Sequence, residues 1–65
     1  MIKEGEIYTN NKSGYPYEVL LIANSEAYVE RRDKFPLTVV YKKLMDGSVW
    51  CREAGEFREK FTRVD

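Results

Sequence analysis

The sequence contains no histidine and only one cysteine, Cys51, and these absences exclude much of the chemistry of protein sites. Without histidine the chain lacks the side chain whose ordinary pKa suits general acid–base catalysis near neutral pH. One thiol cannot form a disulfide within the chain, and without imidazole it leaves too few ligands for a structural zinc site. We therefore expect no metal, no cofactor and no enzymatic activity.

The chain also lacks an excess of charge of either sign and any long apolar run. Eleven basic residues balance eleven acidic ones, whereas proteins that bind nucleic acids usually carry a basic stripe. No segment approaches the roughly 20 apolar residues of a membrane helix, and the start of the chain shows no signal-peptide pattern. We expect neither a nucleic-acid nor a membrane partner, and the lone thiol fits the reducing cytoplasm.

Aromatic residues are abundant: five tyrosines, three phenylalanines and one tryptophan occur in 65 residues. A chain of this length forms a single domain, residues 1–65, and buries only about 60% of the surface that its unfolded form exposes. Without disulfides or metals, so small a fold depends on dense aromatic packing or on self-association. A homo-oligomer is therefore one of the states that we expect.

The strongest local signal is the pair Asp46 and Gly47, which separates two runs rich in β-branched and aromatic residues. It predicts a hairpin over residues 37–52 with a two-residue type I′ loop. This loop places Lys43 opposite Trp50 and gathers four side chains on one face of the hairpin: Tyr41, Lys43, Trp50 and Arg52.

That face has two interpretations. Tryptophan, tyrosine and arginine are over-represented at interface hot spots, so the face is a candidate binding platform. In a domain of this size Tyr41 and Trp50 are also candidates for the core, with Lys43 and Arg52 extending their charged ends to water. On the opposite face, Cys51 is expected to be structural and partly buried.

Alternating polar and apolar residues predict further strands over residues 6–9, 15–23 and 61–64, and residues 52–60 fit one short helical turn with Phe57 directed inward. The second of these strands is apolar on both faces, which predicts a cover on both sides. The expected fold is all-β: a small SH3-like barrel or a bent five-stranded antiparallel sheet with one short helical turn.

Residues 24–36 are ambiguous. Ser25 is placed to cap a helix, but no apolar stripe continues at helical spacing, so we favour an irregular, charged excursion. Arg31 and Arg32 form a local basic cluster there with Lys34. The cluster is a candidate site for a phosphate or an acidic partner, or else a solvated loop paired to Glu30 and Asp33.

Several segments together are similar to a family of short bacterial and phage proteins of unknown function. They are Gly5 to Tyr8, Tyr17-Glu18-Val19 with Ala23, Thr38-Val39-Val40-Tyr41, Asp46-Gly47 with Val49-Trp50-x-Arg52, and Glu56-Phe57 followed by Lys60-Phe61-Thr62. The family's motif continues with Arg-Pro, whereas Glu53 follows Arg52 here. The resemblance covers most of the chain and implies an SH3-like fold and a phage or prophage protein in the bacterial host cytoplasm.

Two functions are consistent with these features. The first is a non-enzymatic module that engages a host protein or its own copies through the hairpin face or by strand addition at a sheet edge. The alternative is an oligomeric sponge with an anti-defence role, which sequesters a nucleotide-like small molecule between aromatic rings and arginines (Arg31, Arg32 or Arg52).

Overall fold

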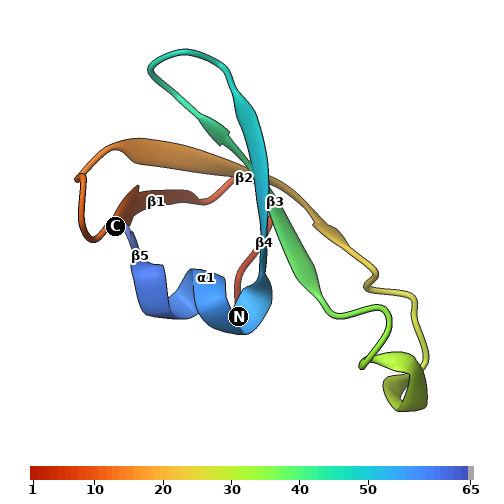
Figure 1. The fold of residues 1–65 in the computed structure, drawn as a ribbon. Coiled ribbons are helices and arrows are strands. Elements are labelled where there is room, and N and C mark those ends of the chain that lie inside the picture. Colours follow the sequence, from red (N-terminus) through yellow and green to blue (C-terminus); the bar gives the residue numbers. More distant parts are fainter. Residues whose placement is uncertain (65) are drawn as a thin grey trace.

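The computed structural model describes residues 1–64, and in this part of the chain lie five strands, one α-helix and one short 3₁₀ helix (Figure 1). In chain order they are β1 (Ile7–Asn10), β2 (Pro16–Ala23), η1 (Val29–Arg31), β3 (Thr38–Lys43), β4 (Val49–Glu53), α1 (Ala54–Lys60) and β5 (Phe61–Arg63).

All strand pairs are antiparallel, and the order across the sheet is β4-β3-β2-β1-β5. The chain therefore winds back and forth from β1 to β4 and then returns through α1, so that β5 pairs with the first strand (Figure 1). The all-β prediction with five antiparallel strands and one short helix is confirmed. The sheet is open, with β4 and β5 at its two edges.

The core forms where α1 packs against the curved sheet. Phe57 is fully buried, and its ring stacks on that of Phe61 with 4.2 Å between the centroids. Tyr8, Tyr17 and Tyr41 surround this pair with their edges or at a tilt. The inward orientation predicted for Phe57 is confirmed, and aromatic packing supports the fold as its composition suggested.

Helix α1 begins directly after β4 because Glu53 caps it. The Glu53 carboxylate accepts a hydrogen bond from the backbone N–H of Gly55 at 2.7 Å, which satisfies one of the free donors of the first turn. Placing the cap here puts Phe57 one turn into the helix and directs its ring toward the sheet. Glu53 thus starts the helical turn directly at the end of β4.

A β-bulge explains why β2 is apolar on both faces. Its pairing with β3 shifts by one residue between Val19 and Leu21, so Leu20 is an extra residue in the strand. After the bulge Ile22 lies opposite the fully buried Val39 and packs against the core, while Leu21 is 44% exposed. Within residues 1–64 the fold itself does not cover Leu21, so only the cover of this face by a second subunit stays a prediction, and the bulge accounts for the change of face along the strand.

The predicted register of the β3–β4 hairpin is also wrong. Lys43 and Ser48 close the loop, with a bond of 2.8 Å from the Lys43 N–H to the Ser48 carbonyl, so the loop has four residues rather than two. Tyr41 consequently lies opposite Trp50, and Cys51 opposite Val40. Because the shift equals two residues, each side chain keeps the face on which it was expected.

The chemistry of the loop explains this difference. A type I′ turn needs a positive φ at both central residues, but only Gly47 has one, at 75°. The carboxylate of Asp46 instead accepts hydrogen bonds from the backbone N–H and the hydroxyl of Ser48, at 2.9 and 2.6 Å. This bonding of Asp46 to the chain two residues on favours the longer loop.

Residues 24–36 form an irregular excursion that projects away from the rest of the fold (Figure 1). The favoured prediction is confirmed, and the alternative helix starting at Ser25 is wrong, because only η1 is helical there and it buries no residue. A hydrogen bond of 2.9 Å from the Asn24 side-chain amide to the Pro36 carbonyl closes its base.

Candidate functional site

The four predicted hairpin residues lie on one face, but at different depths. Tyr41 is only 3% exposed and belongs to the core, whereas Trp50, directly opposite it, is 56% exposed. Lys43 and Arg52 are half-buried. Tyr41 therefore fits the interpretation as core, and Trp50 fits the interpretation as an exposed binding platform. Tyr41 lies on a central strand with neighbours on both sides, while Trp50 lies on the edge strand β4.

Hydrogen bonds hold Trp50 in a fixed orientation. Its indole N–H donates to the Ser48 hydroxyl at 2.7 Å, and that hydroxyl donates to Asp46. The bonds from Ser48 also lower the pKa of the Asp46 carboxyl below its ordinary value, so Asp46 stays charged as an acceptor. The polar edge of the indole is thus satisfied within the hairpin, and its apolar surface faces water.

Arg52 is held by groups on two sides. Its Nε donates to the hydroxyl of the buried Tyr41 at 3.4 Å, and its terminal nitrogen forms an ion pair with Glu56, four residues further along the chain. The bond to Tyr41 chiefly, and then the pairing with Glu56, raise the pKa of Arg52 above its ordinary value. The guanidinium therefore presents a fixed positive charge beside Trp50.

Lys43 is the second cation of the face. Its ammonium lies 4.4 Å from the centre of the Tyr15 ring, within the range of a cation–π contact. Lys43 pairs across the sheet with Tyr17 on one side and meets Ser48 at the hairpin loop on the other. We use the name hairpin face for the exposed surface of Lys43, Trp50 and Arg52.

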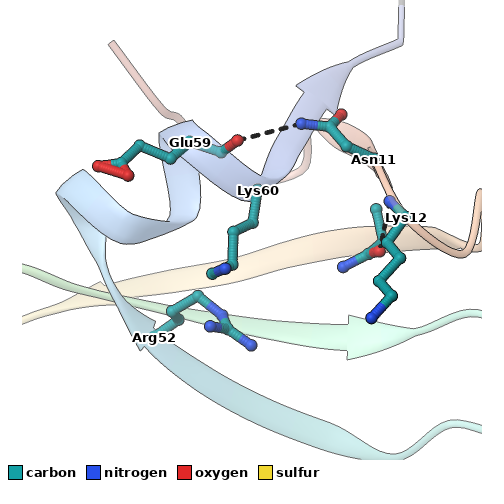
Figure 2. A pocket seen from close by; sticks show the side chains of 6 residues that line it. Asn11, Lys12, Arg52, Glu59 and Lys60 are labelled. Atoms are coloured by element: carbon teal, nitrogen blue, oxygen red, sulfur yellow. Dashed lines mark hydrogen bonds between the residues drawn. The ribbon is translucent and has the colours of Figure 1, made fainter.

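Arg52 also lines a groove of about 430 Å³ at the end of α1 (Figure 2). Lys12, from the loop between β1 and β2, and Lys60, the last residue of α1, lie around the same space. The remaining lining residues are Asn10, Asn11 and Glu59. The sequence alone did not indicate Lys12 and Lys60, because single lysines in a turn and at a helix end have no local pattern that distinguishes them from solvated surface charge.

Arg31 and Arg32 lie on the excursion, apart from the hairpin face (Figure 1). Arg31 stacks over the Phe35 ring at 5.6 Å, and Arg32 donates to the backbone carbonyls of Asn24 and Ser25. Within residues 1–64 neither arginine forms an ion pair with Glu30 or Asp33, the acidic neighbours expected to pair with them in a solvated loop. Both arginines thus stabilise the excursion.

Cys51 is exposed, so the prediction of a partly buried thiol is wrong. It lies on the outer face of β4, which as an edge strand has no neighbour on one side. In the observed register its cross-strand partner is Val40 and not the predicted Lys42.

Residues 1–64 hold no group of three or more histidine, cysteine, aspartate or glutamate side chains placed to bind a metal ion. In the same part of the chain, no helix has the length and apolar character to cross a membrane. No protein-family model, no curated protein and no solved structure matches this chain.

Proposed function

We propose that this protein is a non-enzymatic binding module of phage or prophage type, and that it engages an acidic segment of a host protein through the hairpin face. The observation that carries the proposal is the pairing of a fixed, 56% exposed Trp50 with Arg52, two residues along the same strand. Side chains two residues apart share one face of a strand, about 7 Å from each other.

Trp50 is the first support. Within residues 1–64 its ring belongs to neither the core cluster nor the aromatic pairs of the core. A tryptophan that is already held in one orientation loses little conformational entropy when a partner covers it. Exposed, ordered tryptophan and arginine are the residue types that most often dominate binding energy at interfaces.

The edge of β4 is the second support. Among the strands of residues 1–64, β4 pairs only with β3, so the backbone N–H and C=O groups along its other side have no strand partner there. An extended segment added to this edge would gain main-chain hydrogen bonds and pass beside Trp50 and Arg52. The charges of Lys43 and Arg52 favour acidic residues in that segment.

The order of the strands supports the finer SH3-like description within this proposal. The last strand returns to pair with the first, and the single helical turn stands between the fourth and fifth strands, an order in which pairing of the two edge strands would close a small barrel. The sheet is strongly bent, and both of its edge strands, β4 and β5, lie next to α1 (Figure 1). The phage setting rests on the resemblance of segments stated above.

Capture of a partner by the immobilised chain tests the proposal. The double variant Trp50→Ala/Arg52→Ala should lose the partner that the wild type retains from host extract, identified by mass spectrometry. The matched control is Tyr28→Ala/Arg31→Ala, which removes an exposed aromatic ring and an arginine from the excursion. The control should retain the partner, and circular dichroism should show both variants folded. Equal capture by the hairpin-face variant and the wild type would refute the proposal.

A second candidate is the homo-oligomeric sponge for a nucleotide-like molecule. It is favoured by apolar side chains on the outer face of the sheet, Leu21 and Val49, which are 44% and 60% exposed and open to a second copy. A stable oligomer in light scattering, with a melting temperature that rises with nucleotides, would favour this function over the first. A strict monomer at tens of micromolar would exclude it.

A further inference from the structure

We infer that the groove formed by Lys12, Arg52 and Lys60 is a binding site for an oxyanion, a phosphate or carboxylate group carried by the ligand. The three cations come from the β1–β2 loop, from β4 and from the end of α1, and Figure 2 shows them around one space. The site goes beyond the hairpin face, since two of its three cations lie outside that face.

Positive charge in the groove is not neutralised by its own neighbours. Within residues 1–64, neither Lys12 nor Lys60 forms an ion pair, and Arg52 shares its charge with Glu56 alone. Glu59 is the one acidic residue of the lining, and its carboxylate points away from Lys12 (Figure 2). Glu56 offsets the charge of Arg52 and the Glu59 carboxylate is directed elsewhere, so the two lysines keep unpaired positive charge beside the space and make it attractive to an anion.

Asn11 fixes the two lysines relative to each other. Its backbone N–H donates to the Lys60 carbonyl at 2.8 Å, and its side-chain amide donates to the Glu59 carbonyl at 3.1 Å. These bonds join the β1–β2 loop to the end of α1, although the residues are 48 positions apart. The spacing of Lys12 and Lys60 is therefore set by backbone contacts before any ligand arrives.

The same bonds reduce a source of repulsion. The carbonyl groups at the end of a helix carry partial negative charge and would disfavour an anion nearby. Here the carbonyls of Glu59 and Lys60 are occupied by donors from Asn11. In addition, the Asn10 side-chain oxygen accepts from the backbone N–H groups of Lys12 and Ser13, both at 2.9 Å, which orders the loop that carries Lys12.

Arginine and lysine contribute differently to such a site. The planar guanidinium of Arg52 is oriented by Tyr41 and Glu56, whereas Lys12 and Lys60 supply exposed point charges at the rim. The groove is larger than one phosphate group, so it has room for the group that carries the oxyanion. Two carriers fit this chemistry, the phosphates of a nucleotide-like molecule and the side-chain carboxylates of an acidic segment.

The test is a titration of the full chain with pyrophosphate at low ionic strength, followed by the backbone amide NMR signals of residues 10–13, 52 and 60. We expect saturable shifts at these positions. Lys12→Gln/Lys60→Gln should weaken binding about tenfold or more, because it removes two charge-assisted contacts. The matched control Lys3→Gln/Lys34→Gln removes the same charge outside the groove and should change the affinity less than about twofold, as screened long-range charges do.

Equal weakening by both double variants would overturn the inference, because it would show general electrostatic attraction. Shifts that do not saturate at millimolar pyrophosphate would overturn it as well. Parallel titrations with ADP and with hexaglutamate identify the carrier. The matching carrier should bind more tightly than pyrophosphate, and it should lose affinity in Lys12→Gln/Lys60→Gln. Trp50→Ala should leave pyrophosphate binding intact, which separates this site from the hairpin face.

Discussion

Two regions of the molecule carry arginines and aromatic rings: the packed end, where α1 covers the sheet, and the excursion of residues 24–36. The arginines have different contacts in the two regions. At the packed end Arg52 is oriented by the hydroxyl of a buried tyrosine and by an acidic residue on α1. In the excursion Arg31 and Arg32 contact an exposed ring and loop carbonyls. Basic residues that are adjacent in the sequence thus stabilise a loop, while cations far apart in the sequence form a groove.

Burial explains the contrast. Tyr41 and Phe57 give the packed end a fixed wall against which charged side chains can be oriented. Tyr28 and Val29 in the excursion remain 75% and 81% exposed, so that region has no comparable wall. In this small β domain, the candidate site therefore depends on which charged side chains the core orients, and less on where charges cluster along the chain.

The largest effect that would test this comparison is expected at Phe57. Phe57→Ala removes a fully buried ring that stacks on Phe61 and should cost about 3–5 kcal/mol, enough to unfold so small a domain. Phe35→Ala, in the excursion, removes a ring that is 43% exposed and should cost about 1 kcal/mol or less. Urea denaturation followed by circular dichroism measures both. Similar losses would show that the excursion is as much part of the core as α1.

The second largest effect concerns two backbone positions with a positive φ, one in the β3–β4 loop and one in the excursion. Gly47→Ala places a side chain at a φ of 75° and should cost about 1–2 kcal/mol of unfolding free energy. In the excursion, Asn24 also has a positive φ, 66°, but Asn24→Gly accepts this conformation and loses only the bond to Pro36. Its cost should be about 1 kcal/mol or less. A larger loss for Asn24→Gly than for Gly47→Ala would reverse the comparison.

The sequence predicted the strands, the irregular excursion and the inward direction of Phe57, because each depends on local periodicity or on a single large apolar residue. It did not predict the hairpin register, since the side chain of Asp46 bonds to Ser48 in place of a two-residue turn. Nothing in the composition of the second strand indicated the bulge at Leu20 either.

For the candidate site, the sequence identified Trp50 and Arg52 through residue type and alternation. It also included Tyr41, which the core buries, because alternation gives a face but not its depth. Lys12 and Lys60 were missed, since their proximity to Arg52 depends on Asn11 joining the β1–β2 loop to α1. Long-range contacts of this kind follow from the tertiary structure and have no local pattern.

The smallest effect is a difference in pH dependence. The backbone N–H of Lys3 chiefly, with the Tyr8 hydroxyl and Arg63, holds the pKa of Glu6 below its ordinary value. A lowered folded-state pKa stabilises the fold above the unfolded value, about 4.3, and this contribution is lost as the pH falls through the folded value.

Glu6→Gln should therefore lower the free energy of unfolding near neutral pH. Between pH 5 and 3 the variant should lose less of its unfolding free energy than the wild type, because about one titrating group is missing. Glu30→Gln in the excursion is the control and should keep the wild-type pH profile. Thermal melts across this range measure both variants. An unchanged profile for Glu6→Gln would contradict the ion pairing and hydrogen bonding at the β1–β5 edge.

The central claim, that Trp50 is an ordered but open part of the hairpin face, has a direct test because Trp50 is the only tryptophan. Acrylamide quenching of its fluorescence should show an accessible indole in the free protein, equally at low and at high protein concentration, and protection only when the acidic partner is added. A shielded indole in the free protein at all concentrations, or one that becomes shielded merely as the protein concentration rises, would contradict it.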